Sequence, residues 1–440
     1  MCAADVRIPT DDEIRQIATR AVAEIVPHQE FVDGLRSGRP LRLKMGFDPT
    51  KPVITLGWAV GLRKLRQLQD LGHTVVVIIG DWTARIGDPS GQSQTRPMLS
   101  EEEVKVNSEA ILRQFYKVLD PQRTEIRRQS EWFDRFSLAD IVRLAARFTV
   151  SQMLQRDDFA QRFSEHRPIG LHEFLYPLLQ AYDSVAVEAD VEFGGTDQKF
   201  NNLVGRELQR MLGQKAGPAG QGQAVFLVPL LVGLDGRQKM SQSLGNYIAI
   251  EDPPHDMYGK LMSIPDTLIL DYFELLTDVP DEGLSAIRES IERRAANPME
   301  HKMRLAREIV AQFHSEEAAR DAEDDFHSKF RARVPGDAAF FDAAPEGITS
   351  VRVALSPPSK LHSLPHLIRE AGLATSVSEA RTLVRQGAVE RIGRLLGDAG
   401  EAISRQVSER IERSRVTLND GDVFRVGKHG FLCIVDADKQ

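Results

Sequence analysis

Several short stretches of this sequence combine glycine, hydroxyl and charged residues and are the candidates for binding and chemistry. Residues 46–50 read Gly-Phe-Asp-Pro-Thr, and residues 55–58 read Thr-Leu-Gly-Trp. A helical pattern begins near this second stretch, so Gly57 would let a phosphate or ribose approach the N–H groups of a helix N-terminus. Thr55 adds a hydroxyl, whereas the indole of Trp58 adds one N–H donor and no charge. This region is therefore the first candidate site.

Four further stretches complete the set of candidate residues. Residues 86–91 read Ile-Gly-Asp-Pro-Ser-Gly, and residues 176–183 read Tyr-Pro-Leu-Leu-Gln-Ala-Tyr-Asp. Residues 194–198 read Gly-Gly-Thr-Asp-Gln, and residues 239–243 read Lys-Met-Ser-Gln-Ser. No cluster of histidine or cysteine shows metal-ligand spacing, so we expect no metal site built by the protein itself.

The pattern of apolar residues places these stretches on two β-α-β units. In the first, strand patterns at 41–45 and 74–79 flank a helical pattern at 58–71. In the second, strand patterns at 185–193 and 224–232 flank a helix at 197–212. Two such units predict a Rossmann-like, doubly wound α/β domain with its ligand at the carboxyl ends of the strands.

The sequence also predicts how the chain divides into domains. Residues 1–250 would form the Rossmann-like domain, with a helix at 10–26 and a mostly helical insertion at 101–179. Residues 251–333 read as an all-helical domain and residues 334–359 as a linker. Residues 360–440, which begin with a helical pair and end in short strands, would form a small α+β domain.

The composition is that of an ordinary globular protein, with 440 residues, of which 42% are hydrophobic and 27% charged. The net charge of -8 gives no general nucleic-acid-binding character, although residues 360–440 carry 13 Lys and Arg against 11 Asp and Glu, a net +2. Two cysteines at opposite ends of the sequence, Cys2 and Cys433, predict a reduced, cytoplasmic protein. The start is acidic and polar rather than a signal peptide, and no apolar run is long enough to span a bilayer.

In their order and spacing, these stretches resemble those of class I tyrosyl-tRNA synthetases. The likeness is closest to the bacterial subgroup in which a lysine, here Lys44, precedes Met-Gly-Phe-Asp-Pro. It runs from about residue 25 to the C-terminus. The resemblance implies that tyrosine reacts with ATP, which brings Mg²⁺, and that the tyrosyl group then passes to the 3′ end of tRNA; it also implies a homodimer. A carboxylate needs no general base at neutral pH, so the chemistry depends on positioning and charge stabilisation.

The resemblance implies an intact amino-acid pocket. Asp183 would accept the phenol hydroxyl of tyrosine, and Gln198 would lie near its carboxylate. A buried aspartate can demand a hydroxyl, because an analogue without one leaves the carboxylate unpaired. Asp88, Tyr176 and Gln180 would hold the ammonium group. The pocket for tyrosine or a related amino acid would comprise Lys44, Asp88, Tyr176, Gln180, Asp183 and Gln198.

The ATP signatures depart from the family pattern. The family reads His-x-Gly-His where this chain has residues 55–58, and Lys-Met-Ser-Lys-Ser where it has residues 239–243, so Gln242 replaces a lysine that steadies pyrophosphate. The positions that match ATP contacts are Asp48, Thr50, Thr55, Gly57, Trp58, Gly195, Asp197 and Lys239, and the catalytic positions are Thr55, Lys239, Ser241 and Gln242. One donor to a developing oxyanion is worth roughly 10²–10³ in rate, so three changed positions predict adenylation slowed roughly 10³–10⁶-fold. Without adenylation, neither ATP nor Mg²⁺ would be needed.

We therefore predict a paralogue with a redirected role, which binds tyrosine or a related amino acid and ligates or transfers it in another reaction, for example in specialised metabolism. One alternative is a working tyrosine–tRNA ligase that tolerates the variant signatures. Another is a non-catalytic protein that binds tRNA or senses an amino acid.

The C-terminal residues from 361 resemble the small S-four-type RNA-binding domain of bacterial tyrosyl-tRNA synthetases. On this resemblance, Arg381, Arg385 and Arg391 are candidate contacts to tRNA phosphates. After Gly387 the sequence departs from the family pattern, and residues 394–413 predict an extra helical insertion. Such an insertion would alter or abolish tRNA recognition.

Overall fold

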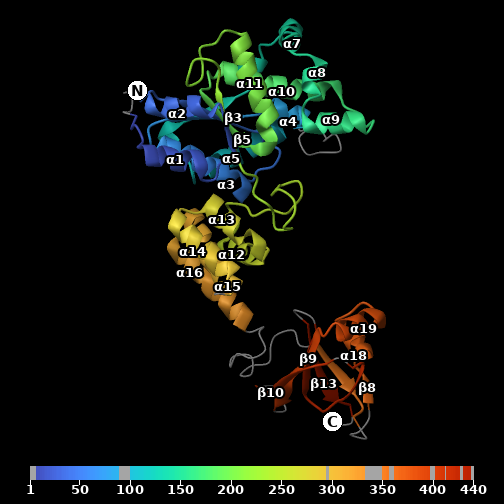
Figure 1. Ribbon diagram of the computed structural model, residues 1–440. Coiled ribbons are helices and arrows are strands. Elements are labelled where there is room, and N and C mark those ends of the chain that lie inside the picture. The colour runs from blue at the N-terminus through green and yellow to red at the C-terminus, as the bar shows by residue number, and fades with distance from the viewer. Residues whose placement is uncertain are drawn as a thin grey trace. The chain divides into compact units, whose positions relative to one another are not determined.

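The computed structural model describes residues 6–88, 100–293, 297–331, 349–355, 361–396, 402–411, 413–426 and 430–437. It divides the chain into two compact units, Met1–Ala322 and Glu323–Gln440, each with its own secondary structure (Figure 1). No helix in the described ranges is both long and apolar enough to cross a membrane.

The first unit is built on a six-stranded sheet with the order β1-β6-β5-β2-β3-β4. All neighbours are parallel except β1, which runs antiparallel to β6. The strand order reverses between β5 and β2, and ligands of such sheets bind at this point, beyond the carboxyl ends of the strands. The strands are β1 Glu24–Val26, β2 Arg42–Phe47, β3 Thr74–Ile79, β4 Thr124–Arg128, β5 Val191–Gly195 and β6 Ala224–Val228.

Two β-α-β units carry the strands that flank this reversal. Helix α3 (Leu56–Gln69) connects β2 to β3, and α11 (Lys199–Met211) lies between β5 and β6. Strand β3 forms from a β-branched run whose residues 75–79 are fully buried, as expected in the middle of a parallel sheet. The predicted Rossmann-like architecture is confirmed.

The remaining helices of this part surround the sheet and supply several candidate residues. They are α1 Asp11–Thr19, α2 His28–Arg36, α4 Thr83–Ile86, α5 Glu101–Phe115, α6 Ser130–Phe133, α7 Leu138–Ala145, α8 Val150–Met153, α9 Asp157–Ser164 and α10 Leu175–Ala186, with short 3₁₀ turns at Pro121–Arg123, Leu171–Phe174 and Thr196–Gln198.

Three predicted elements of this unit differ from the structure. The predicted helix at 10–26 ends at Thr19, because Arg20 is extended and Ala21 has a φ of 53°, and the chain then pairs with β6 as β1. The predicted strand at 185–193 begins only at Val191, since α10 continues to Ala186. Strand β4 lies inside the stretch predicted to be mostly helical and completes one edge of the sheet.

The rest of the first unit is helical, as predicted. Its helices are α12 Pro254–Ser263, α13 Ile269–Leu276, α14 Asp281–Glu292, α15 Pro298–Phe313 and α16 Glu316–Arg331, with a 3₁₀ turn at Asp266–Leu268; α16 extends past the boundary of the unit. The Tyr272 hydroxyl donates to the carbonyl oxygen of Val232 at 2.7 Å, which ties α13 to the segment after β6.

The second unit is a small α+β structure. Its five-stranded sheet has the order β10-β9-β12-β13-β7, and β11 pairs with β8 in a separate ladder. Its core gathers buried residues such as Ile368, Val384 and Phe424. The elements are β7 Thr349–Val353, β8 Leu361–Ser363, α18 Leu364–Glu370, α19 Val377–Arg385, β9 Val389–Leu396, β10 Ala402–Arg410, β11 Arg415–Thr417, β12 Asp422–Val426 and β13 Gly430–Asp436.

Two features of this unit differ from the sequence prediction. The helical insertion predicted at 394–413 is wrong: β9 and β10 form an antiparallel pair there, and β9 also pairs with β12. Strand β7 lies within the range predicted as a linker, yet it pairs in parallel with β13. At residues 394–413, the hydrogen bonds of β9 and β10 to their neighbouring strands outweighed the local helical pattern of the sequence.

Candidate active site

Asp48 follows β2 directly and links two helices at the carboxyl end of the sheet. Its Oδ2 accepts a hydrogen bond from the hydroxyl of Tyr176 on α10 at 2.8 Å, and its Oδ1 accepts from the hydroxyl of Thr83 on α4 at 2.7 Å. Burial raises the pKa of Tyr176, and the charges of Asp48 and Asp88 raise it further, so the phenol stays protonated and donates. The nearby Thr50 donates its N–H to the carbonyl oxygen of Asp48 at 2.8 Å.

Asp183 lies two turns after Tyr176 on α10 and is 2% exposed. Its Oδ2 accepts from Nε2 of Gln129 at 2.8 Å, and its Oδ1 accepts from the indole N–H of Trp132 at 3.2 Å. Burial raises the pKa of Asp183 to about 7, although the positive charge of Lys44 acts in the opposite direction. Two carboxylate oxygens offer about four lone pairs, so this group can accept a further hydrogen bond from a ligand hydroxyl.

Lys44, on β2, is fully buried and makes three contacts within the protein. Its ammonium lies 2.9 Å from Oε1 of Glu192, 2.8 Å from the Ser184 hydroxyl and 2.9 Å from the carbonyl oxygen of Gln180. Because two of these partners belong to α10, the ammonium fixes the helix that carries Gln180 and Asp183. Lys44 therefore positions the pocket and contributes a charge that acts on Asp183.

Asp88, Gln198 and Gln180 belong to one hydrogen-bond network. Asp88 accepts from Nη2 of Arg156 at 3.0 Å and from Nε2 of Gln198 at 2.8 Å. The amide of Asn201 donates to Oε1 of Gln198 at 3.1 Å and to Oε1 of Gln180 at 2.9 Å. The structure thus brings together the three predicted residues from separate parts of the sequence.

Sequence reasoning missed four residues that hold this pocket. Gln129 and Trp132 donate to Asp183, Arg156 pairs with Asp88, and Glu192 neutralises Lys44. Gln129, Trp132 and Arg156 lie in the predicted insertion, where no local motif marks them, and only the tertiary fold shows their roles.

The segment at 55–58 begins α3 and packs against the loop at 239–243. Thr55 is 1% exposed and occupies the N-cap position without a side-chain cap bond. A Cβ on Gly57 would lie 3.5 Å from Cβ of Met240, so the two signature segments meet here. The Trp58 ring packs on Phe47, with a centroid separation of 4.4 Å.

The loop at 239–243 is held by polar contacts on both sides. The N–H of Ser241 donates to Oδ1 of Asn246 at 2.9 Å, and the Lys239 ammonium contacts the Asp197 carboxylate. The Gln242 amide donates to the carbonyl oxygen of Val53, and Nζ of Lys51 donates to the carbonyl oxygen of Gln242 at 2.8 Å. Lys239 therefore lies within this loop, and Lys51 contacts it from another segment.

Gly195 ends β5 beside Asp197. A Cβ at this position would lie 2.6 Å from Cδ2 of Leu230 and 2.7 Å from Oδ1 of Asp197, so a larger residue would have to displace these side chains. Among the described residues, no group of three or more His, Cys, Asp or Glu is suited to hold a metal ion.

The three candidate RNA-binding arginines fall into two groups. Arg381 and Arg385 are exposed on α19 and share a face because they are four residues apart. Arg391, on β9, donates to the carbonyl oxygen of Thr417 and lies over the Phe424 ring at 5.1 Å. Arg391 therefore contacts β11 and β12 inside the second unit.

Comparison with known proteins decides the family. The model for "tRNA synthetases class I (W and Y)" matches residues 36–331. A "Tyrosine--tRNA ligase" of Dehalococcoides mccartyi is 49% identical over 423 residues, which cover 96% of this chain and 98% of that protein. The chain belongs to the bacterial-type class I tyrosyl-tRNA synthetase family. A "Tyrosine--tRNA ligase" of Thermotoga maritima is 46% identical over 427 residues, 97% of this chain and 98% of that protein.

Solved structures of the family share the fold of this synthetase-family chain. A C-terminally truncated mitochondrial tyrosyl-tRNA synthetase of Aspergillus nidulans matches with a TM-score of 0.61 and 20% identity, and the match covers 72% of this chain and 94% of that chain. The Archaeoglobus fulgidus tyrosyl-tRNA synthetase, solved in complex with L-tyrosine, matches with a TM-score of 0.57 and 24% identity over 71% of this chain and 99% of that chain.

These comparisons overturn our main functional prediction. We predicted a redirected paralogue with impaired adenylation, on the basis of the changed residues at 55, 58 and 242. Relatives named "Tyrosine--tRNA ligase" at 46–49% identity over nearly the whole chain support the working ligase instead. The prediction gave too much weight to isolated signature residues and too little to the rest of the site.

Proposed function

We propose that this chain is a working tyrosine–tRNA ligase. It would join tyrosine to ATP with release of pyrophosphate, and would then transfer the tyrosyl group to tRNA. The proposal rests on the similarity to proteins of that name, which are 48–49% identical to this chain over 94–96% of its length. The buried Asp183, with room for one more hydrogen bond, supports tyrosine as the amino acid, because phenylalanine would leave this polar group without its partner.

In the first step, a carboxylate oxygen of tyrosine attacks the α-phosphorus of ATP, and the bond from that phosphorus to pyrophosphate breaks. No proton needs to be removed, so the protein contributes positioning and positive charge. The helix N-terminus at Leu56 offers N–H groups, and Gly57 keeps this approach free of a side chain. Asp197 forms an ion pair with Lys239, whose ammonium would lie beside the phosphates. Mg²⁺ would come with the nucleotide.

Lys51 would compensate for the missing second lysine of the loop. Its ammonium lies at the backbone of Gln242, so a positive charge is present at the same point of the loop although residue 242 is neutral. We assign to Lys51 the stabilisation of the departing pyrophosphate. Trp58 stands at the position where the family has a histidine. Its indole ring packs on Phe47 at the N-terminus of α3.

The partners of the proposed ligase are tyrosine, ATP and tRNA. Arg381 and Arg385 form an exposed cationic face on α19 that suits the phosphates of tRNA. A homodimer in the cytoplasm, the usual form of the family, is part of the same proposal.

Aminoacylation of a tyrosine tRNA transcript with labelled tyrosine and ATP tests the whole reaction. We expect charging with tyrosine and none with phenylalanine. The variant Arg381→Gln/Arg385→Gln should raise KM for tRNA and leave pyrophosphate exchange unchanged, because it removes only phosphate contacts. Exchange without any charging of tRNA would rule out the ligase and leave only an adenylating enzyme.

A further inference from the structure

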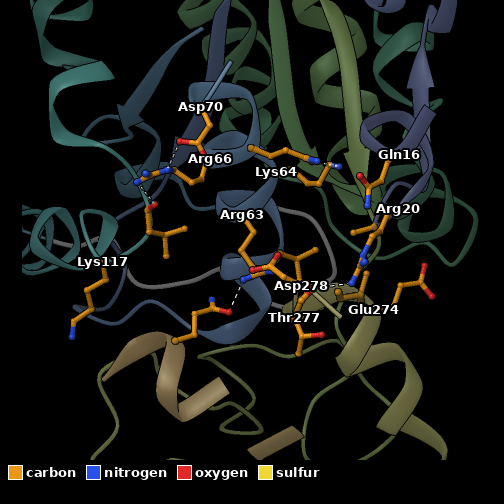
Figure 2. A pocket seen from close by; sticks show the side chains of 16 residues that line it. Gln16, Arg20, Arg63, Lys64, Arg66, Asp70, Lys117, Glu274, Thr277 and Asp278 are labelled. Carbon is orange, nitrogen blue, oxygen red and sulfur yellow. Dashed lines mark hydrogen bonds and ion pairs between the residues drawn. The ribbon is translucent and has the colours of Figure 1, made fainter. Parts of the chain in front are cut away.

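A crevice of about 460 Å³ lies in the first unit, away from the active site. It opens beside the C-terminal half of α3, and its walls come from the segments after α1 and α5 and from α13 (Figure 2). Arg63 follows Thr55 by eight residues on the same helix, a rise of roughly 12 Å. None of the candidate active-site residues lines it. The cations that line it are Arg20, Arg63, Lys64, Arg66 and Lys117.

Positive charge exceeds negative charge in this crevice. Three carboxylates, Asp70, Glu274 and Asp278, line it beside the five cations, which leaves a net charge of +2. Arg66 pairs with Asp70 at 2.9 Å, and Arg63 pairs with Asp278 at 2.6 Å. The excess positive charge therefore comes from the three other lining cations, Arg20, Lys64 and Lys117.

Arg20 and the two lysines supply that excess. Arg20 donates to the carbonyl oxygens of Thr277 and Val279 and lies 3.7 Å from Asp281, just outside the lining. Within the described part of the chain, no carboxylate lies within 4.0 Å of the ammonium of Lys64 or of Lys117. Neither ammonium group is therefore neutralised by an ion pair with a described carboxylate.

Lys64 is the most unusual of these cations. It is 5% exposed, and its ammonium donates to Oε1 of Gln67 at 2.7 Å and lies 5.8 Å from the centre of the Phe226 ring. Burial, together with the charges of Arg20 and Arg63, lowers the pKa of Lys64 to about 7. A buried ammonium among like charges is costly, and a bound anion would offset that cost.

We propose that this crevice is a second ligand site, which binds a small phosphate-bearing anion. With Lys64 protonated the lining carries a net charge of +2, which a dianionic phosphate matches, and guanidinium and ammonium groups are the usual donors to its oxygens. The volume is in the range of small-molecule sites. Because Lys64 is buried, only a small ligand that enters the crevice reaches it, whereas the backbone of a folded RNA would stay at the rim. The site is independent of adenylation.

Sulfate and inorganic phosphate are the probes for this site, and sulfate has the advantage that it does not titrate near pH 7. The full chain is labelled with ¹³C-lysine, and the Lys64 signal is assigned with the variant Lys64→Arg. The pH titration of that signal is then recorded with and without each anion. We expect saturable shifts, an increase in the Lys64 pKa of about one unit, and net proton uptake on binding at pH 8.

Two variants locate the binding. Arg63→Gln should weaken sulfate binding about tenfold or more, while tyrosine binding shows that the variant is folded. Lys239→Met, which alters the loop of the active site, should leave the Lys64 response intact. The proposal would be overturned if the Lys64 signal does not respond to either anion at about 100 mM. It would also be overturned if binding is lost in Lys239→Met and retained in Arg63→Gln. A response to tRNA but to neither small anion would also overturn it and make the crevice an RNA contact.

Discussion

The ammonium of Lys51 lies 2.8 Å from the backbone carbonyl oxygen of Gln242, in the loop that carries Lys239. Residue 242 is the position at which the family places a second lysine in this loop. A positive charge from another segment, five residues before the start of α3, therefore lies beside the backbone of this position. The role proposed for Lys51 in adenylation rests on this contact.

The first prediction concerns Lys51. The variant Lys51→Met should slow tyrosine-dependent pyrophosphate exchange by roughly 10²-fold, because it removes a cation from the departing pyrophosphate. Adding Gln242→Lys to Lys51→Met should restore most of that loss. The exposed Lys215, mutated to Met, serves as the control and should have no effect. Equal exchange by Lys51→Met and the wild type would remove Lys51 from the mechanism.

The second prediction concerns pH and the affinity for tyrosine. The pKa of Asp183 is about 7 in the free protein, and a hydrogen bond from the tyrosine phenol favours the ionised carboxylate. Tyrosine should therefore bind more weakly as pH falls below 7, by about tenfold per unit, and should release a proton on binding. Calorimetry between pH 5.5 and 8 measures both effects.

Asp183→Asn and phenylalanine provide the controls for this titration. The variant should weaken tyrosine binding by about 1.5–3 kcal/mol and should abolish the pH dependence. Phenylalanine should bind weakly at every pH. A pH profile that survives in Asp183→Asn would assign the titration to another group.

The third prediction concerns the buried ion pair of Lys44 and Glu192, whose side chains are 0% and 1% exposed. Lys44→Met leaves a buried carboxylate without its cation and should destabilise the protein by about 3–5 kcal/mol in denaturant unfolding. It also removes a charge that lowers the pKa of Asp183. The midpoint of the tyrosine pH profile should therefore move to higher pH. A loss of stability with an unchanged midpoint would confine Lys44 to a structural role.

The fourth prediction concerns Lys64 and stability. Its pKa is lowered from 10.5 in the unfolded chain to about 7 in the folded protein, so the unfolded state binds the extra proton between these values. Stability should rise with pH across that window. Lys64→Met should be more stable than the wild type by about 1–4 kcal/mol at pH 7, and the difference should shrink toward pH 10.5. A constant difference from pH 7 to 10 would mean that Lys64 stays charged.

The regular parts of the fold could be predicted because local pattern and tertiary environment agree. Strand β3 matches its predicted range, since a continuous run of β-branched residues is typical of a strand buried inside a parallel sheet. Residues 402–410 could be read as helical because Ile403 and Val407 are four apart, but pairing with β9 makes them a strand. The early end of α1 depends on a positive φ at Ala21, which no residue preference signals.

The sequence motifs name candidate site residues but not the side chains that contact them. Asp183, Asp88 and Gln198 stand in recognisable stretches, and the structure places polar partners on each of them. Trp132 and Arg156 reach the pocket from elements with no such motif, so their contacts follow only from the fold. The functional prediction was wrong because it weighed the changed positions 55, 58 and 242 without the rest of the chain, which is 46–49% identical to proteins named "Tyrosine--tRNA ligase".

Tyrosine-dependent ATP–pyrophosphate exchange on the purified full chain tests the central claim most directly. We predict exchange on the order of 1–10² per second, an ordinary rate for such an enzyme, and at most a few-fold gain in the variant Thr55→His/Trp58→His/Gln242→Lys. Exchange at the background of Lys239→Met, with a gain of 10³-fold or more in the triple variant, would contradict the account and show that the native signatures do not support adenylation.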